Sequence, residues 1–396
     1  MKTIASANFK NQRALIRVDF NVPLNNELEV TDNTRIKAAI PTIKHVLEKG
    51  GSVVLMSHLG RPKEGPEHKF SLRHIVFELE KLIETSVIFL DNCIGRYTLQ
   101  VTSNLQPGQV VLLENLRFYK EETAGDEEFA KKLSQHGDIY INDAFGTAHR
   151  AHASTAVIAK YFPNDKYFGL LLEREIANID AVLKNPQSPT AAIIGGAKVS
   201  SKISIIEHLM DSVDEIIIGG GMAYTFIKAL GGKVGTSLVE DDYIETALSV
   251  IEKAKAKGVK IHLPSDTVIA NQFSNDAEIK SCPTNEIPDG WMGLDLSTNS
   301  IKTFSQVIEN SKTILWNGPM GVFEMSNFKK GTEAIANALV KATENGAFTL
   351  VGGGDSVAAI NALNLSDKVS YVSTGGGAML EYLEGKELPG IQAILS

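Results

Sequence analysis

The chain has 396 residues, of which 43% are hydrophobic, and its 39 lysines and arginines against 47 aspartates and glutamates give a formal net charge of −8. This length exceeds what one hydrophobic core usually serves, so we expect two domains. The negative balance excludes a broadly basic surface for nucleic acid or an acidic membrane, although it still allows a local basic pocket.

Cysteine content and hydrophobicity indicate the cellular environment. The only cysteines, Cys93 and Cys282, fit neither a disulfide framework nor a metal site. No run of about 18 apolar residues occurs, and Lys10, Arg13 and Arg17 interrupt the first part of the chain. We therefore expect a cytoplasmic protein with no membrane partner and no nucleic-acid partner.

The first half of the chain alternates short apolar runs with helix-like segments. The apolar runs span residues 14–20, 52–57, 110–113 and 138–141, and polar residues end or follow each of them. Helical spacing of apolar residues appears at 34–49 and 71–84. This alternation predicts a parallel sheet with covered faces, whose ligands lie beyond the carboxyl ends of the strands. The polar residues that follow each run are therefore candidates for a binding site.

Arginines recur where this site is predicted, with His58 and His149 near them in sequence. Four of them each lie beside a predicted strand end or an early helix turn: Arg35, Arg61, Arg117 and Arg150. A guanidinium binds a carboxylate or phosphate through two parallel hydrogen bonds, so this set indicates a site for a small anion. Arg17 and Asp19 point the same way along one strand, and a structural ion pair is the alternative for Arg17.

An amphipathic helix is predicted at residues 169–184. Leu172, Ile176, Ile179 and Leu183 recur at helical spacing, and the two prolines of 185–189 end the pattern. Every arginine precedes the end of this helix, whereas every triple glycine follows it. The chain therefore changes its means of binding anions here, from guanidinium groups to glycine-rich turns.

The second half repeats the alternation of strand and helix with different strand endings. Its predicted strands are at 191–194, 215–218, 260–263, 313–316, 348–351 and 369–374. We predict an α/β fold of two Rossmann-like, doubly wound parallel-sheet domains, joined by a central helix and separated by a hinge cleft. The expected divisions are 1–168, 169–185 for the helix and linker, 186–378, and 379–396 for a C-terminal segment.

Triple glycines follow three of these strands, at 219–221, 352–354 and 375–377. Glycine lets the backbone approach an anion closely, and the free N–H groups of a first helical turn attract phosphate. Three such turns in one domain favour a nucleotide site over simple packing turns, and Asp355 could hold a magnesium ion that bridges phosphates. The chain contains neither G-x-x-x-x-G-K-[ST] nor G-x-G-x-x-G, which counts against P-loop NTPases, dinucleotide-binding dehydrogenases and protein kinases.

Two lysines stand near the first of the glycine-rich turns. Lys198 and Lys202 are four residues apart, and the spacing predicts two ammonium groups on one face of a helix start. Such groups could neutralise phosphates as point charges, with two solvated lysines as the alternative. Anion sites on two domains suggest transfer of a charged group, for which phosphoryl transfer needs mainly positioning, cations and exclusion of water.

Seven motifs, in this order along the chain, resemble those of phosphoglycerate kinases. They are LIRVDFNVP at 15–23, SHLGR at 57–61, ENLRF at 114–118, AHR at 148–150, GGAKV at 195–199, WNGPMGVFE at 316–324 and GGGDS at 352–356. The resemblance spans essentially the whole chain. It implies a monomeric glycolytic phosphotransferase with a carboxyl group as acceptor. Such an enzyme moves the acyl phosphate of 1,3-bisphosphoglycerate reversibly to MgADP, in line after hinge closure, giving 3-phosphoglycerate and MgATP.

The resemblance also implies roles for individual residues. In the domain 1–168, 3-phosphoglycerate is expected at Asp19, Asn21, Arg35, His58, Leu59, Gly60, Arg61, Arg117 and Arg150. In the domain 186–378, the nucleotide is expected at Gly196, Ala197, Lys198, Lys202, Gly221, Gly293, Asn317, Pro319, Glu324, Gly353, Gly354, Asp355 and Ser356, with Mg²⁺ on Asp355. The expected catalytic groups are Arg35, Lys198, Gly375 and Gly376. The segment 379–396 is expected to return to the first domain.

The chemistry of this reaction needs no general base. When ATP is used, the nucleophile is a carboxylate, which is already ionised at pH 7. His58 and His149 are therefore predicted to bind or orient the substrate. Two other functions fit the residues less well: a different ATP-dependent carboxylate kinase, which would need fewer cations, and a hinged two-domain anion-binding protein, a class that is normally exported.

Overall fold

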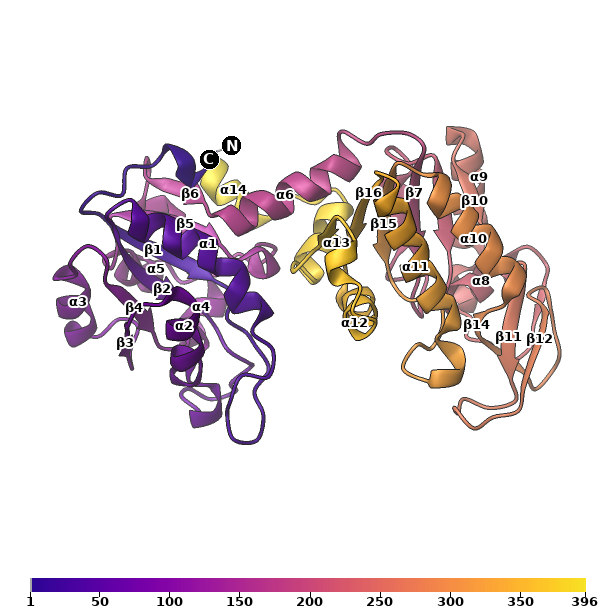
Figure 1. Cartoon of the computed structure of the whole chain (residues 1–396), viewed down its shortest axis with the longest axis horizontal. Coiled ribbons are helices and arrows are strands. Elements are labelled where there is room, and N and C mark those ends of the chain that lie inside the picture. The colour runs from indigo at the N-terminus through magenta and orange to yellow at the C-terminus, as the bar shows by residue number, and fades with distance from the viewer. Residues whose placement is uncertain (1) are drawn as a thin grey trace. The chain divides into compact units, whose positions relative to one another are not determined.

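The computed structural model describes residues 2–396, which form two compact units (Figure 1). Unit 1 runs to Ile176 and takes up the chain again at Lys386–Ser396, whereas unit 2 is the continuous segment Ala177–Gly385. Each unit contains one six-stranded sheet in which all neighbouring strands are parallel. The predicted α/β fold class with two parallel-sheet domains is confirmed.

The strands of unit 1 are apolar along nearly their whole length, as expected for a parallel sheet covered on both faces. Every residue of β2 and β4 is buried. The strand order is β3 (Val87–Leu90), β4 (Val110–Leu113), β2 (Ser52–Met56), β1 (Arg13–Val18), β5 (Ile139–Asp143) and β6 (Lys166–Phe168). Ile16 is level with Leu55 on one side and Ile141 on the other, so the carboxyl ends of the central strands meet at one edge.

The helices of unit 1 follow the alternation that the sequence predicts, except that one predicted helix is divided into two elements. They are α1 (Thr34–Glu48), α2 (Val76–Ile83), α3 (Arg96–Ser103), α4 (Lys120–Ala124), α5 (Glu127–Ser134) and α14 (Pro389–Leu395). Shorter 3-10 turns are η1 (Ile4–Ser6), η2 (His68–Phe70), η3 (Leu72–Ile75), η4 (Leu116–Phe118), η5 (Phe145–Thr147) and η6 (Val157–Tyr161). The helix predicted at 71–84 divides into η3 and α2, because Ser71 Oγ accepts a hydrogen bond from Arg73 N and tightens the first turn. Figure 1 shows α14 (yellow) beside β6.

Unit 2 contains the second parallel sheet and a smaller antiparallel one. The large sheet has the order β10 (Lys260–His262), β8 (Glu215–Ile218), β7 (Thr190–Ile194), β15 (Thr313–Asn317), β16 (Phe348–Val351) and β17 (Tyr371–Val372). The small sheet has the order β12 (Ile279–Pro283), β11 (Asp266–Ala270) and β14 (Met292–Leu296), and β13 (Glu286–Ile287) pairs with β9 (Lys233–Val234). The sequence did not predict the antiparallel strands, because β12 is mostly exposed and lacks an apolar pattern.

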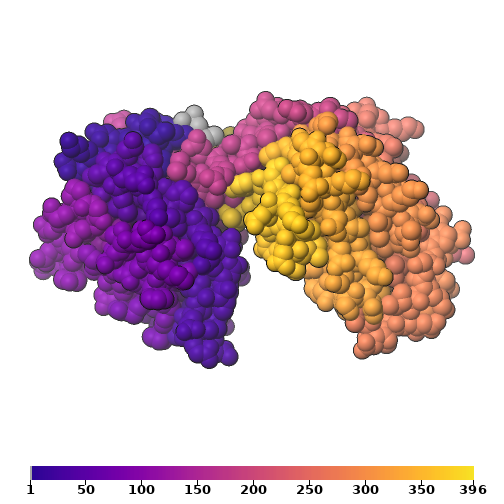
Figure 2. Space-filling model, in the orientation of Figure 1, coloured from indigo at the N-terminus to yellow at the C-terminus, as the bar shows by residue number. Residues whose placement is uncertain are grey.

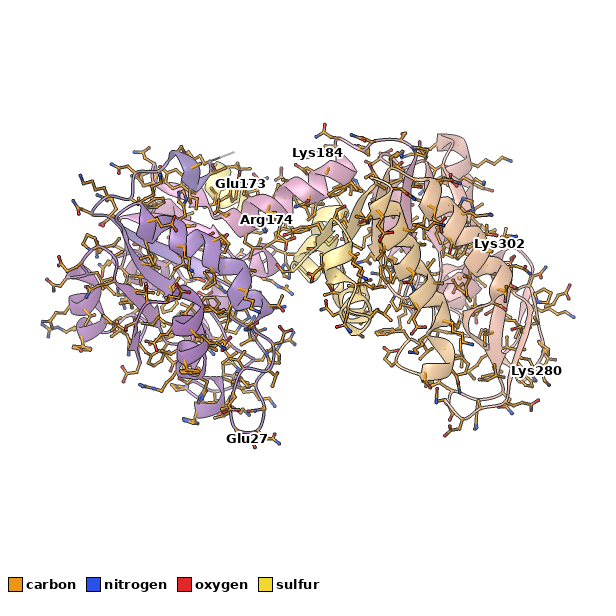
Figure 3. All side chains as sticks on the ribbon, viewed as in Figure 1. Glu27, Glu173, Arg174, Lys184, Lys280 and Lys302 are labelled. Atoms are coloured by element: carbon orange, nitrogen blue, oxygen red, sulfur yellow. The ribbon has the colours of Figure 1, made fainter. Side chains whose placement is uncertain are left out.

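The helices of unit 2 connect these strands. They are α7 (Ile203–Leu209), α8 (Met222–Ala229), α9 (Ile244–Lys257), α10 (Thr298–Asn310), α11 (Lys330–Glu344), α12 (Gly354–Ala362) and α13 (Gly377–Leu383). The 3-10 turns are η7 (Asp241–Tyr243), η8 (Ser326–Phe328) and η9 (Ser366–Lys368). Figure 3 labels Lys302 on α10 and Lys280 on β12, which marks the outer strand of the small sheet.

Each large sheet packs its own core. In unit 1, Ile16 of β1 and Ile43 of α1 are completely buried in one apolar cluster. In unit 2, Trp316 of β15 packs with Phe304 of α10 and Leu339 of α11, and all three are completely buried. These cores fix the strand ends where the predicted site residues lie.

Helix α6 (Leu170–Leu183) joins the two units and corresponds to the predicted central helix. Unit 1 ends within it at Ile176, and unit 2 begins with Ala177. Figure 3 labels Glu173 and Arg174 in its first half and Lys184 just past its end. No helix within residues 2–396 is both long and apolar enough to cross a membrane.

Candidate functional site

Three residues of unit 1 that are predicted to bind the acidic substrate form one hydrogen-bonded group. Arg35 of α1 donates to Asp19 Oδ2 at 3.0 Å and to the backbone oxygen of Asn21 at 3.3 Å. The Asn21 side chain then accepts the N–H of Gly60 at 2.8 Å, which joins the loop after β1 to the loop after β2. Part of the Arg35 side chain stays accessible, with 38% of its surface exposed. One edge of the guanidinium is therefore fixed while another part faces solvent.

The remaining arginines line a cavity of about 820 Å³ at the same edge of the sheet. Arg61, Arg117 and Arg150, which follow β2, β4 and β5, contribute to its wall. Arg117 also donates to the Gly60 oxygen at 2.8 Å, so this cavity adjoins the Arg35 group. Burial and then the charges of neighbouring arginines lower the pKa of Arg117. The mutual repulsion of these cations favours an anion among them.

A second layer of polar side chains lies beneath these arginines. Arg17 is almost fully buried and donates through Nε to Ser154 Oγ at 2.8 Å. Its NH2 group lies 3.3 Å from His58 Nδ1, and because a guanidinium only donates, Nδ1 accepts. Glu122, which is also buried, accepts hydrogen bonds from the Ser154 hydroxyl at 2.6 Å and the Ser154 N–H at 3.0 Å. Arg17 is thus held by Ser154 and His58, which replaces the ion pair with Asp19 that the sequence left open.

Two histidines of this site, His58 and His152, are neutral at pH 7 because burial lowers the pKa of each. Burial, followed by the charges of Arg17 and Arg117, lowers the pKa of His58 well below its ordinary value. The same causes lower the pKa of His152 to about 4. His152 lines the cavity with the arginines, and it lies two residues past the AHR motif, outside the residues selected from the sequence. Leu59, between His58 and Gly60, is held by a hydrogen bond from Asn115 Nδ2 to its oxygen at 2.7 Å.

All nine residues expected to bind the acidic substrate therefore lie at the carboxyl edge of one sheet. Direct contacts link Arg35, Asp19, Asn21, Gly60 and Arg117. The cavity wall brings Arg61 and Arg150 to Arg117, and Leu59 and His58 adjoin Gly60 in the chain. The result is a concave cationic surface suited to a small molecule with more than one negative group.

The glycine-rich turns of unit 2 are connected through Asn317, at the end of β15. Asn317 Oδ1 accepts from the Lys202 ammonium, and Asn317 Nδ2 donates to the Gly352 oxygen at 2.7 Å. Ser356 accepts the N–H of Gly318 through its hydroxyl, so the turns after β15 and β16 are joined twice. Burial lowers the pKa of Lys202, whereas the charge of Asp355 raises it. A partly buried cation and a carboxylate thus face one another at the start of α12.

Gly353 shows why this turn requires glycine. Its φ of 92° lies in the left-handed region, and a Cβ there would lie 2.4 Å from Asn317 Nδ2. Gly354, Asp355 and Ser356 follow as the first turn of α12, whose N–H groups have no partner in the preceding turn of the helix. Gly354 and Asp355 are exposed and their N–H groups suit an anion, whereas Ser356 is buried beneath them. Figure 2 shows the yellow part of unit 2, which holds α12 and α13, as one continuous surface.

Two further groups of predicted residues lie on the same unit. Gly196 donates its N–H to the Pro319 oxygen at 3.1 Å, which joins the turn after β7 to the turn after β15. Gly221 lies against Ala197 and the half-exposed Leu238, and Gly293 donates to Ser237 Oγ at 2.9 Å. These contacts place the residues along neighbouring turns, and Glu324 is exposed in the loop after β15.

The prediction that Lys198 and Lys202 share one face of a helix start is wrong. Helix α7 begins only at Ile203, so Lys202 is its N-cap at the end of the turn 200–202, and Lys198 lies before that turn. Ser200 holds that turn, since its N–H and hydroxyl donate to the Glu240 carboxylate at 2.9 and 2.6 Å. Lys198 is consequently exposed, whereas Lys202 is partly buried against Asn317.

Gly375 and Gly376 form the turn that precedes α13. Gly375 N lies 3.1 Å from Ser373 Oγ, and Gly376 has a φ of 50°. The backbone is therefore turned sharply before Gly377, the first residue of the helix.

Asp295 is a buried carboxylate beside the predicted nucleotide residues, and no sequence motif predicted a role for it. It is buried at the end of β14, where its carboxylate accepts the N–H of Leu296 at 2.8 Å and of Gly331, in α11, at 2.9 Å. Burial is the main reason that its pKa is raised to about 7. A Cβ at Gly321 would lie only 2.3 Å from Asp295 Oδ1, so the carboxylate directly underlies the loop that leads to Glu324.

Known proteins of one family match the chain throughout. The profile of the family described as phosphoglycerate kinase matches residues 4–386. A phosphoglycerate kinase of Porphyromonas gingivalis is 51% identical over 99% of both chains, and a cytosolic one of Triticum aestivum is 53% identical over 99% of this chain and 97% of its own.

Solved structures give the same match. Phosphoglycerate kinase from Coxiella burnetii has a TM-score of 0.91 and 40% identity, and covers 99% of this chain and 98% of its own. The enzyme from Pyrococcus horikoshii has a TM-score of 0.83 and 29% identity, and covers 100% of this chain and 98% of its own. The alternatives of a different carboxylate kinase and of an anion-binding protein are therefore set aside. The chain belongs to the phosphoglycerate kinase family and has that family's phosphotransferase activity in glycolysis.

Proposed function

We propose that unit 1 binds 3-phosphoglycerate or 1,3-bisphosphoglycerate at the nine residues of its cationic edge. The observation that carries this assignment is the cluster of Arg61, Arg117 and Arg150 on one cavity, next to the partly exposed Arg35. The substrate carries a phosphate at one end and a carboxylate at the other. Several guanidinium groups can therefore bind it at both ends, and Asp19 and Asn21 hold Arg35 in place for the transferring group.

Unit 2 binds ADP or ATP along its glycine-rich turns. Gly353, Gly354 and Ser356 offer backbone and hydroxyl donors to phosphates, and Lys202 supplies a nearby positive charge. Gly196, Ala197, Gly221, Gly293, Asn317, Pro319 and Glu324 line the rest of the nucleotide site, with Glu324 on the ribose. Lys198 is exposed and so free to follow the transferring phosphate.

Asp355 would hold a magnesium ion that accompanies ADP or ATP, and such an ion would neutralise charge on the phosphates. No group of three or more potential ligands (His, Cys, Asp or Glu) lies together anywhere in residues 2–396. This fits an ion that the nucleotide brings, since Mg²⁺ is often held by one carboxylate together with phosphates and water. Asp355, exposed in the first turn of α12 and close enough to raise the pKa of Lys202, is that carboxylate.

The transfer itself needs positioning and charge stabilisation from the protein. We propose in-line transfer after the two units close, with Arg35 and Lys198 on the transferring group and the N–H groups of Gly375 and Gly376 on its developing charge. His58 acts as a neutral binding group, because its pKa is far below 7. The residue divisions 1–168, 169–185, 186–378 and 379–396 serve as substrate domain, connector, nucleotide domain and returning segment.

A coupled assay of ATP-dependent phosphorylation of 3-phosphoglycerate tests these roles. We expect Arg35→Ala and Lys198→Ala each to lower kcat by on the order of 100-fold or more, as loss of a transition-state donor does. Arg73→Ala and Lys302→Ala are matched controls that remove an exposed cation elsewhere in each unit (Figure 3 labels Lys302). Equal losses in the controls, or unchanged kcat in both test variants, would contradict the assignment.

The remaining expectations concern the state of the protein. We propose a monomer in the cytoplasm with small-molecule partners only. The relatives from Triticum aestivum and Volvox carteri are named cytosolic and chloroplastic, respectively. Light scattering at increasing protein concentration tests the monomer, with a mass near 42.9 kDa as the expected result. A mass twice as large would contradict it.

A further inference from the structure

Two consecutive buried residues end β5, directly before the loop that carries Arg150. Asn142 and Asp143 are completely buried, and neither belongs to the nine substrate residues. Asp143 is level with Val18 of the neighbouring strand β1, so its position in the sheet is fixed.

Asp143 binds the start of α6. Its Oδ1 atom accepts the N–H groups of Leu171 at 2.9 Å and Leu172 at 3.2 Å. The preceding N–H, of Leu170, donates to Thr42 Oγ1 at 2.9 Å. The first N–H groups of a helix have no partner within the helix, so these three bonds attach the start of α6 to β5 and α1.

Gly169 permits this close approach. A Cβ at this position would lie 2.2 Å from Asp143 Oδ1 and 2.3 Å from its Cγ. The N–H of Gly169 also donates to the oxygen of Asn142 at 2.9 Å. Strand end and helix start are therefore in direct contact, without an intervening side chain.

Asn142 attaches the other segment by which the chain passes between the units. Its Nδ2 donates to the oxygen of Gly390 at 3.3 Å, and the N–H of Gly390 donates to the oxygen of Ala148 at 2.8 Å. Gly390 belongs to α14, in the segment that re-enters unit 1 at Lys386. The chain leaves unit 1 through α6 and returns through this segment, and both are anchored on adjacent residues of β5.

Asn142 also holds the loop that carries Arg150. Asn142 Oδ1 accepts the N–H of Ala144 at 3.2 Å, and its Nδ2 also donates to the oxygen of Thr155 at 3.3 Å. The Thr155 hydroxyl donates to the oxygen of Arg150 at 2.8 Å. The loop that presents Arg150 is thus held by Asn142, which also bonds to Gly169 before α6 and to Gly390 of α14.

We propose that Asp143 and Asn142 are positioning residues for phosphoryl transfer, which couple the Arg150 loop to α6 and to the C-terminal segment. This inference rests on the proposed closure of the two units. A bound anion draws Arg150 toward the cavity, and the shared anchor transmits that displacement to the two connections. The role of Asp143 is distinct from binding the substrate, because its carboxylate bonds to the helix start.

The test compares substrate binding, turnover and closure in Asp143→Ala and Gly169→Ala. Asp143→Ala removes the acceptor, and Gly169→Ala pushes the helix start away from it. We expect kcat to fall by about 10-fold to 100-fold, as misplacement by about 1 Å does, while calorimetry gives a Kd for 3-phosphoglycerate within threefold of the wild type. By X-ray scattering, we expect the radius of gyration of the wild type to decrease when 3-phosphoglycerate and MgADP are added, and we expect no such decrease in either variant. Asp143→Asn keeps an oxygen acceptor and should recover most of kcat.

A matched control and a double variant separate this role from simple helix capping. Asp126 also caps a helix of unit 1, accepting the N–H of Phe129 at 2.7 Å, and Asp126→Ala, which removes that acceptor, should leave kcat unchanged. A Cβ at Gly169 would also lie 2.6 Å from Asp143 Cβ, which alanine keeps, so the double variant is Asp143→Gly/Gly169→Ala. Its new methyl group meets no side chain at position 143, so kcat should equal that of Asp143→Gly alone. If the two substitutions lowered kcat additively in the double variant, the contact between Gly169 and residue 143 would not be the cause of the loss.

Other outcomes also decide between the proposals. Full ligand-induced compaction and normal kcat in the soluble variants, with only a lower melting temperature, would show that Asp143 stabilises the fold alone. A Kd for 3-phosphoglycerate that weakens in step with kcat would overturn the coupling role in favour of substrate binding. Absence of compaction in the wild type would instead contradict the proposed closure itself. Should Asp143→Ala fail to fold, Gly169→Ala and Asp143→Asn still give the same readouts.

Discussion

The buried carboxylate of Asp295 should make the stability of the protein depend on pH in a way that Asp295→Asn removes. Burial is the main cause that raises the pKa of Asp295 from 3.8 to about 7. A raised carboxyl pKa means that the folded state binds more protons than the unfolded state between these two values. The contribution of Asp295 to stability is therefore fully present below pH 3.8 and is lost as pH rises toward 7.

The magnitude follows from the shift. One pKa unit corresponds to about 1.4 kcal/mol, so the full shift of roughly three units costs about 4 kcal/mol above pH 7. Between pH 5 and pH 7, the wild type should lose about 2 kcal/mol of unfolding free energy through this group. The new side chain of Asp295→Asn cannot ionise, so its contribution to stability does not change with pH. Its amide NH2 group replaces one of the two oxygens that accept the N–H groups of Leu296 and Gly331, which lowers the unfolding free energy by about 1–3 kcal/mol at every pH.

Urea unfolding of wild type and Asp295→Asn at several pH values between 4 and 8 measures the effect. The unfolding free energy of the variant minus that of the wild type should increase by about 2 kcal/mol from pH 5 to pH 7 and then level off. Asp143 has a similarly raised pKa, but it is present in both proteins and cancels in the difference. Parallel curves over this range would refute the reasoning, whatever the constant offset between them.

Three further predictions concern the site and the core. Arg35→Ala should lower kcat at least tenfold more than His58→Gln. Neither variant should acquire a bell-shaped pH profile of kcat, because the attacking carboxylate needs no base. Comparable losses of kcat, with a new bell-shaped profile for His58→Gln, would contradict this prediction. Gly353→Ala should raise the KM for MgATP by about tenfold or more and leave the KM for 3-phosphoglycerate unchanged, because the new Cβ would lie 2.4 Å from Asn317 Nδ2 at a φ of 92°. Steady-state kinetics with each substrate varied in turn measure the two KM values. Phe304→Ala should destabilise unit 2 by about 3–5 kcal/mol in urea unfolding, since the ring is completely buried in the core; a loss below about 1 kcal/mol would refute that core assignment.

Much of the fold could be predicted because parallel strands have a strong local signature. Runs such as Val110–Leu113 are apolar throughout and are followed by polar or glycine-rich turns, which reveals both the strand and the edge where ligands bind. The antiparallel hairpin of β11 and β12 lacks this signature. Ile279–Pro283 is mostly exposed, so no burial pattern marks it in the sequence.

The second layer of the site depends on contacts that no local pattern contains. Arg17 was paired with Asp19 as an alternative because they share one strand face, yet its Nε donates to Ser154, which is 137 residues away. The helix start expected at Lys198 was wrong for a similar reason, since the acceptor that holds Ser200 in a turn is Glu240, from a distant loop. Which residues reach the strand edge follows from local sequence, whereas how they are held there follows from the tertiary fold.

The re-entry of Lys386–Ser396 into unit 1 has a consequence for biosynthesis. Leu388, Ile391 and Ile394 are buried in unit 1, so its packing is incomplete until Lys386–Ser396 has been translated and has left the ribosome. Unit 2 is continuous in sequence and has no such dependence. Nascent chains stalled before Lys386 therefore lack three apolar side chains of unit 1, and the unit that begins first along the chain finishes its packing only after unit 2 has been made.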